Sequence, residues 1–239
     1  MALQRALIKS LRESFAAHAD PVRAKPMQAY MKSAMPFQGV ASPVWRRFLR
    51  EAIAAHPAGS TRDLADTMRH LWRSAKFREQ RYVAAELARF GPHKRLLDLS
   101  LLPLYTEMIR DGAWWDFCDD LSGYELGQLL VKYPRDMKPL LRRWAKGDDL
   151  WLRRASFLCQ RHLKSGIDVK LLYDCILPSI GKGKFADEFF IRKGIGWALR
   201  ERSYAAPEEV TAFCRDHAAE ISPLTRREAL RVIEKGARY

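Results

Sequence analysis

Aromatic and acidic residues are concentrated in one segment of this 239-residue chain, residues 112–120, which reads GAWWDFCDD. On a helix, Trp115 and Asp119 are four residues apart and share a face. An indole face attracts positive charge and a carboxylate beside it stabilises that charge further, so this spacing suits a site that handles a cation. The other interpretation places the tryptophans in the core and the acids at a helix start, and from the pattern alone it is the simpler one. Asp111 and Asp116 fit that second interpretation, and no chemistry is assigned to them.

Two further segments place tryptophan near basic or small residues. Trp151 and Arg154 are three residues apart and are therefore neighbours on one helix face. Trp197 follows Gly194 and Gly196, and a glycine inside a helix costs about 1 kcal/mol relative to alanine. That cost indicates the close approach of another backbone or a ligand, or equally a tight contact between helices.

The chain is strongly basic, with 42 Lys and Arg against 28 Asp and Glu and a net charge of +14. Such a balance is typical of proteins that bind a polyanion, and nucleic acid is the first candidate. A soluble basic protein without a polyanionic partner is the alternative. Residues 141–203 supply half of the net charge, and basic pairs recur at 142–143, 153–154 and 192–193. These pairs predict a ladder of phosphate contacts, although a solvated basic face would have the same composition.

Several chemistries are poorly supported by the sequence. The four cysteines form no CxxC pair, so we expect reduced, mostly buried thiols in a cytosolic protein. The six histidines show no metal-site spacing, and the sequence holds neither a phosphate-binding glycine loop nor a nucleophile-elbow motif. The sequence contains no run of about 18 consecutive apolar residues, the length that would predict a membrane-spanning helix. We therefore expect no metal, no cofactor and no membrane association.

Apolar residues recur with a period near 3.6 in nearly every segment, as in Leu64, Met68, Leu71 and Trp72. The first fifteen residues follow this pattern too, with basic residues between Leu3, Leu7 and Leu11, which predicts an amphipathic helix instead of a signal peptide. Sustained period-two alternation is hard to find. We predict about a dozen helices, short loops and no sheet. Residues typical of helix caps stand at expected starts, namely Ser42 before Pro43, Ser60 with Asp63, and Asp149, and glycines 112, 147, 166 and 183 stand at expected ends.

The helical pattern repeats along the chain. Residues 149–155 align with residues 188–194, each with an acid, three apolar residues, two bases and a small residue. Phe77, Trp114 and Trp151 mark helix starts at equal intervals of 37 residues. A period of about 35–45 residues in an all-helical chain is typical of stacked helix pairs, which bury their apolar faces against their neighbours. Such a solenoid offers a concave face to a long, rod-like ligand.

The same segments show a family resemblance. The motifs WWDFCD at 114–119, DDLWLRRA at 148–155 and EFFIRKGIGWALRE at 188–201 resemble the DNA alkylation repair family of HEAT-like alkylpurine DNA glycosylases, the AlkD-like enzymes. The resemblance covers essentially the whole chain, from Lys25 to Ala229. It implies an all-α superhelical solenoid of stacked HEAT-like helical repeats, forming a single domain over residues 1–239 whose concave face holds double-stranded DNA.

The resemblance also implies an activity in base excision repair. It is the excision of cationic alkylated purines, such as 7-methylguanine and 3-methyladenine, by hydrolysis of the N-glycosidic bond without a metal or a cofactor. Asp119 matches the family's catalytic aspartate. Trp115 and Trp197 match its two lesion-flanking tryptophans, and Arg154 matches an arginine that grips the DNA.

Tyr30 and Phe190 match positions that lie near the DNA in the family. The DNA backbone is expected to contact the remaining basic candidates, Arg153, Arg192, Lys193 and Arg200. The sequence departs from the family pattern at residues 117–118, where smaller or aliphatic side chains are expected, and this should affect packing more than chemistry. It departs again at Gly194, a position that is often alanine.

The chemistry explains why one carboxylate suffices. Alkylation at N7 or N3 makes the purine a cationic leaving group, and bond breaking gives the sugar oxocarbenium character. An ionised Asp119 would stabilise that sugar and position the attacking water. This role requires the carboxylate to face the basic concave surface near both indoles. If the carboxylate were buried or pointed away from the indoles, the protein would be expected only to bind a polyanion. Whether the base is flipped out is left open.

Two other classes of function remain. One is a non-catalytic HEAT-like scaffold that binds DNA or RNA, for which a carboxylate among phosphates would bring no advantage. The other is a protein-interaction solenoid, which would not need the net charge of +14. For the leading hypothesis we expect a monomer in the bacterial cytoplasm, associated with the nucleoid when it is bound to DNA.

Overall fold

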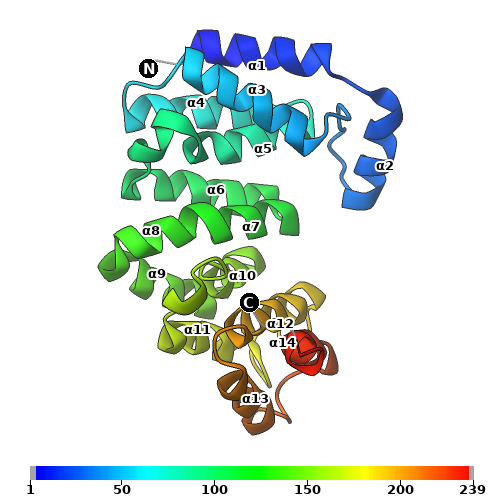
Figure 1. Ribbon diagram of the computed structural model, residues 1–239, viewed down its shortest axis with the longest axis vertical. Helices are drawn as coiled ribbons and strands as arrows, with labels where there is room; N and C mark the ends of the chain where they lie inside the picture. Colours follow the sequence, from blue (N-terminus) through cyan, green and yellow to red (C-terminus); the bar gives the residue numbers. More distant parts are fainter. Residues whose placement is uncertain (1–3, 237–239) are drawn as a thin grey trace. The chain divides into compact units, whose positions relative to one another are not determined.

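All regular secondary structure in residues 4–236, which a computed structural model describes, is helical (Figure 1). The all-α prediction is confirmed there, with fourteen α-helices where the pattern indicated about a dozen. The chain divides into two compact units, with the boundary between Met108 and Ile109. The organisation of residues 1–239 as one domain stays a prediction.

The first unit consists of helices with buried apolar stripes. Its α-helices are α1 (Arg5–Ala17), α2 (Pro21–Met31), α3 (Ser42–Ala55), α4 (Thr61–Arg73), α5 (Arg78–Glu86) and α6 (Leu102–Gly112), which runs on into the second unit. Short 3-10 turns lie between α5 and α6 at Leu87–Arg89, Gly91–Leu96 and Leu99–Leu101. The predicted stripe of α4, Leu64, Met68, Leu71 and Trp72, is buried.

The amphipathic helix predicted at the beginning of the chain is present as α1. Its buried side chains are Leu7, Ile8, Leu11 and Phe15, and its basic residues lie on the other faces. Leu3 lies outside the described residues. Among residues 4–236, no helix combines the length and the apolar character needed to cross a bilayer.

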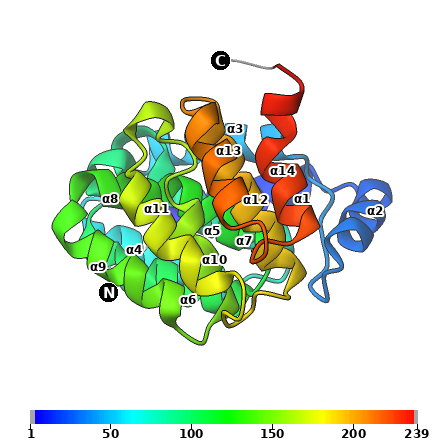
Figure 2. The same cartoon turned by 90° about the horizontal axis from the view of Figure 1, so that it is seen from below.

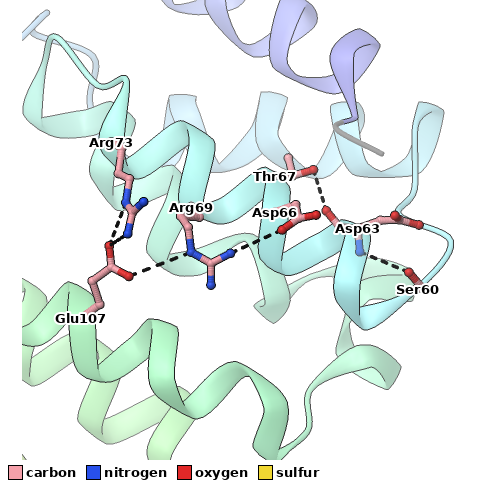
Figure 3. A network of polar contacts seen from close by, with 7 residues as sticks. All are labelled: Ser60, Asp63, Asp66, Thr67, Arg69, Arg73 and Glu107. Carbon is pink, nitrogen blue, oxygen red and sulfur yellow. Dashed lines mark hydrogen bonds and ion pairs between the residues drawn. The ribbon is translucent and has the colours of Figure 1, made fainter. Parts of the chain in front are cut away.

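Helix α4 is fixed at both ends by polar contacts (Figure 3). The Ser60 hydroxyl accepts a hydrogen bond of 3.1 Å from the backbone N–H of Asp63, as the cap prediction requires. At the other end, Arg73 donates two hydrogen bonds, of 2.9 and 2.6 Å, to one oxygen of Glu107 in α6. This doubly hydrogen-bonded ion pair links α4 to α6 within the first unit.

The second unit holds the segments with candidate chemistry. Its α-helices are α7 (Trp115–Leu121), α8 (Gly127–Lys132), α9 (Pro134–Lys146), α10 (Leu150–Leu158), α11 (Val169–Ile176), α12 (Phe189–Ser203), α13 (Pro207–Asp216) and α14 (Pro223–Glu234). A π-helical turn, Ser122–Leu126, joins α7 to α8, and 3-10 turns lie at Lys164–Gly166 and Leu177–Ser179. Helix α10 packs against α7, α9, α11 and α12, and α12 packs in turn against α14 (Figure 2).

Helix starts in the second unit follow the repeat pattern. Asp149 caps α10, because its carboxylate accepts hydrogen bonds of 3.0 and 2.9 Å from the N–H groups of Trp151 and Leu152. Helix α12 begins at the corresponding position, one residue after Glu188. The cap prediction at Ser42 is wrong by one residue. Ser42 is the first residue of α3, and the cap position is occupied by Ala41, whose side chain makes no hydrogen bond.

Candidate functional site

The carboxylate of Asp119 and the guanidinium of Arg154 form a buried ion pair. Arg154 Nε lies 2.7 Å from Asp119 Oδ1, and Arg154 Nη2 lies 2.7 Å from Asp119 Oδ2. The two side chains are only 8% and 3% exposed. This fork geometry holds both oxygens of the carboxylate at once, and it brings together two of the predicted site residues from α7 and α10.

Arg154 also ties this pair to α12. Its Nη1 donates a hydrogen bond to the backbone oxygen of Phe190, in the first turn of that helix. Burial lowers the pKa of the Arg154 guanidinium, but the charge and the hydrogen bonds of Asp119 outweigh burial and leave that pKa above its ordinary value. A permanently charged arginine therefore stands at the junction of three helices.

The glycines of α12 are explained by two close contacts. A Cβ atom at Gly194 would lie 3.1 Å from Arg154 Cζ and 2.9 Å from a ring carbon of Phe157. A Cβ atom at Gly196 would lie 2.8 Å from the backbone oxygen of Thr225 in α14. Gly194 therefore makes room for the arginine of the ion pair, and Gly196 lets α14 approach.

An aromatic cluster lies beside the ion pair. The ring centroids of Trp151 and Phe190 are 5.1 Å apart, and that of Trp114 is 5.2 Å from that of Phe190. All three residues are half-buried, and Phe189 beside them is 57% exposed. Phe190 thus contributes a carbonyl to Arg154 and a ring to this cluster.

The two predicted tryptophans are both half-buried, and each has an acidic residue one turn further along its helix. Trp115 lies one turn before Asp119 in α7. Trp197 Nε1 donates a hydrogen bond of 2.8 Å to Glu201 Oε1 in α12. The four-residue spacing of Trp197 and Glu201, which puts both on one helix face, is visible in the sequence.

Arg161 is a second cation of the site, and sequence analysis missed it. It follows α10, in a turn without a helical pattern, and its Cζ lies 4.6 Å from the centroid of the Trp197 ring. Burial lowers the pKa of the Arg161 guanidinium, and the opposing charges of Asp119, Asp120 and Glu201 raise it only in part. Arg161 therefore lies against the Trp197 ring in the electrostatic field of these carboxylates.

Cys118, which precedes the candidate catalytic residue, is not a nucleophile. Its side chain is fully buried and its Sγ donates a hydrogen bond of 3.2 Å to the backbone oxygen of Trp151. Burial, and then the charge of Asp119, raises the pKa of this thiol well above its ordinary value. Phe117 is buried as well, so the residues that depart from the family motif fill the core.

The prediction that Arg153 contacts the DNA backbone does not agree with its position. Arg153 is 2% exposed and donates hydrogen bonds to the backbone oxygens of Gly147, Pro178 and Lys184, at 2.8, 2.7 and 3.2 Å. Successive residues of a helix point about 100° apart, so the two arginines of the pair lie on different faces. The ladder of basic pairs at one repeat phase is therefore not present at 153–154.

The other basic candidates lie at or near the surface in ion pairs. Arg192 pairs with Asp187, while Lys193 and Arg200 both pair with Glu228 of α14. Their side chains are 34%, 41% and 18% exposed, respectively. Their contact with DNA stays a prediction. Tyr30 lies in α2 of the first unit, and it is 75% exposed.

Comparisons with known proteins give the family. Residues 11–233 match the model of the DNA alkylation repair enzyme family, so the chain belongs to that family. The fold is similar to a solved structure described as a predicted DNA alkylation repair enzyme from Enterococcus faecalis. The TM-score is 0.73 at 26% identity, over 91% of this chain and 98% of that chain. The comparison with curated proteins found no match. Family membership supports a role in the repair of alkylated DNA.

Proposed function

We propose that this protein is a monofunctional DNA glycosylase that hydrolyses the N-glycosidic bond of cationic alkylpurines, such as 7-methylguanine and 3-methyladenine, in duplex DNA. One observation carries the proposal. The Asp119 carboxylate is gripped on both oxygens by Arg154 and lies one helical turn from Trp115. A scaffold that only grips phosphates has no need for an oriented carboxylate among its cations.

The reaction needs one cation to be stabilised. The bond between the sugar carbon C1′ and the purine nitrogen breaks, its electron pair goes to the base, and the cationic base leaves neutral. Positive charge then develops on the sugar, where a fixed carboxylate in a site of low dielectric is most effective. Water adds to the sugar carbon and loses a proton, for which Asp119 is the acceptor.

Arg154 acts in this proposal on Asp119 instead of on the DNA. Its guanidinium is 3% exposed and its donors already bind Asp119 and the Phe190 carbonyl. A preorganised carboxylate does not have to reorient as charge develops, which lowers the barrier. In this proposal the DNA phosphates are bound by partly exposed basic side chains, such as those of Lys193 and Arg192.

A second candidate function is favoured by the burial of the carboxylate. Asp119 is only 6% exposed, and a buried carboxylate is what a protein that merely binds a polyanion would have at this position. In that case the ion pair would only join α7 to α10 in a DNA-binding scaffold. The two candidates differ in whether the carboxylate is needed for bond cleavage or only for folding.

The experiment is release of 7-methylguanine from methylated duplex DNA in a metal-free buffer, followed by chromatography. Removing one partner of a buried pair costs about 3–5 kcal/mol, so Asp119→Asn is accompanied by a double variant, Asp119→Leu with Arg154→Met, which replaces the pair by apolar groups. We expect the wild type to release the base, and the folded double variant to bind DNA without releasing it.

Thermal unfolding and DNA affinity serve as controls for both variants. Full release by a folded variant that lacks the carboxylate would remove Asp119 from the chemistry. A wild type that binds DNA and releases no alkylated base would favour the scaffold.

A further inference from the structure

The two arginines of the candidate site differ in how many of their donors are used. Arg154 donates hydrogen bonds from Nε, Nη1 and Nη2, to Asp119 and to the Phe190 carbonyl. Arg161 makes no hydrogen bond and no ion pair with any residue that the structure describes. Its Nε is buried, but its terminal nitrogens, Nη1 and Nη2, remain accessible to solvent. Arg161 therefore has the unused donors that Arg154 lacks.

The position of the Arg161 guanidinium is nevertheless fixed by its neighbours. Its Cζ lies 4.6 Å from the Trp197 ring centroid and 5.9 Å from that of Tyr124. A Cβ atom at Gly123, in the π-helical turn, would lie 2.8 Å from Arg161 Cζ and 2.7 Å from Nη2. The absence of a side chain at Gly123 thus lets the flat cation lie against the indole. These contacts orient the guanidinium without using its terminal hydrogen atoms.

Asp119 is the charged group that acts most strongly on this cation. Burial lowers the pKa of Arg161, and the charge of Asp119 opposes burial more than the charges of Asp120 and Glu201 do. Both oxygens of Asp119, however, are already bound by Arg154. Arg161 therefore lies in the field of the candidate catalytic carboxylate without being neutralised by direct contact with it.

We propose that Arg161 binds the DNA phosphate next to the alkylated nucleotide. This inference rests on the proposed function, which places the reacting sugar at Asp119. A phosphate attached to that sugar then lies near the carboxylate, and the two like charges repel unless a cation offsets them. Nη1 and Nη2 present the planar pair of donors that a guanidinium offers to a phosphate. Arg154 cannot do this because its donors are used, so Arg161 takes the role that the sequence indicated for Arg154.

A purely structural role for Arg161 predicts a different result. If Arg161 only supported the Trp197 ring, its loss would affect every duplex alike, whatever the charge of the DNA backbone. As a phosphate ligand, Arg161 matters only where that phosphate is charged. Replacing the phosphate by an uncharged methylphosphonate therefore separates the two roles.

The test measures dissociation constants by fluorescence anisotropy for duplexes with one 7-methylguanine on a 2′-fluoro sugar, which resists cleavage. The backbone is either unmodified or carries one methylphosphonate, on the 5′ or the 3′ side of the lesion. For Arg161→Gln we expect affinity for the unmodified duplex to fall roughly 10-fold, the value of one charge-assisted contact. The slope of log affinity against log salt should fall by about one unit. With the methylphosphonate at the contacted position, the wild type should lose the same factor and Arg161→Gln should lose nothing further.

Three further variants serve as comparisons, and thermal unfolding checks that each is folded. Arg161→Lys keeps the charge, so it should retain the salt slope and part of the affinity. Gly123→Ala keeps the total charge but displaces the guanidinium, so it should become insensitive to the methylphosphonate, as Arg161→Gln does. Lys193→Gln also removes one charge, and its effect should add to that of the methylphosphonate.

An unchanged salt slope in Arg161→Gln would overturn the inference. Losses from Arg161→Gln that add to those from the methylphosphonate at both positions would also overturn it. Failure of the wild type to release the base from a cleavable duplex would instead overturn the proposed function, because the coupling of Arg161 to one phosphate is measured without cleavage.

Discussion

At the scale of single residues, neighbouring side chains in α10 have different functions. Arg154 faces α7 and binds Asp119. Arg153 instead donates hydrogen bonds to the backbone oxygens of Gly147, which precedes α10, and of Pro178 and Lys184. Burial leaves neither of them on the surface where a phosphate would meet it. The types of the residues indicated phosphate binding, but their places in the helix assign one to the candidate site and the other to stability.

Arg153 is expected to contribute to stability and not to DNA binding. Arg153→Met leaves the carbonyl oxygens of Gly147 and Pro178 without their donor, so the free energy of unfolding should fall by about 2–3 kcal/mol. Urea denaturation measures this loss. The exposed Arg143 provides the control, since Arg143→Met should leave stability nearly unchanged. A stable Arg153→Met variant with weakened DNA binding would contradict the assignment.

At the scale of secondary-structure elements, the start of α10 determines where Arg154 lies. Asp149→Ala removes the acceptor for two backbone N–H groups, and the loss of such a cap costs about 1 kcal/mol. We expect a lower melting temperature together with slower base release. The neighbouring Asp148 is the matched control, because it is exposed, pairs with Lys184 and does not cap the helix. Equal effects of Asp148→Ala and Asp149→Ala would argue against the capping role.

The contact between α12 and α14 is expected to depend on pH. Burial favours the protonated form of Glu228, but Lys193 and Arg200 outweigh burial and hold the pKa of this carboxyl below its ordinary value of 4.5. A carboxyl whose pKa is lowered by folding stabilises the fold above its unfolded pKa, and this contribution is lost as the pH falls through the folded pKa.

Glu228→Gln should therefore be less stable than the wild type at pH 7, by about 2 kcal/mol, because two charge-assisted contacts are lost. The difference should shrink as the pH falls below about 4.5, where the carboxyl of the unfolded wild type becomes protonated, and it should be lost once the pH is below the lower folded pKa. Chemical denaturation at a series of pH values measures it. A difference that is constant down to pH 3 would show that charge plays no part.

At the scale of the whole molecule, the net charge of +14 should govern affinity for DNA of any sequence. Each phosphate that a cation neutralises contributes roughly 0.9 to the slope of log affinity against log salt. Lys193 is 41% exposed, so Lys193→Gln should reduce the slope by about one unit if this lysine meets a phosphate. Arg153→Met should leave the slope unchanged. Fluorescence anisotropy over a salt series tests both expectations, and an unchanged slope for Lys193→Gln would place that lysine off the DNA.

Much of the local structure could be predicted from the sequence. The helical class, the buried stripe of α4 and the caps at Ser60 and Asp149 all follow from interactions within a few residues of the chain. The spacing of Trp115 and Asp119 and the matching motifs also led to the family, which the comparison over residues 11–233 confirms. The ladder of basic pairs is absent at 153–154 because composition does not specify which face of a helix a residue occupies.

The amino-acid sequence by itself therefore determined the helical class, the helix starts at Ser60 and Asp149, the excess of positive charge and the family. These properties depend on neighbours in the chain or on simple sums over it. Only the tertiary structure decided that Arg154 forms an ion pair with Asp119, 35 residues away in sequence, and that the guanidinium of Arg161 packs on the ring of Trp197, 36 residues away. Such contacts depend on how α7, α10 and α12 pack together, and this packing is the sum of many weak interactions between residues that are distant in the chain.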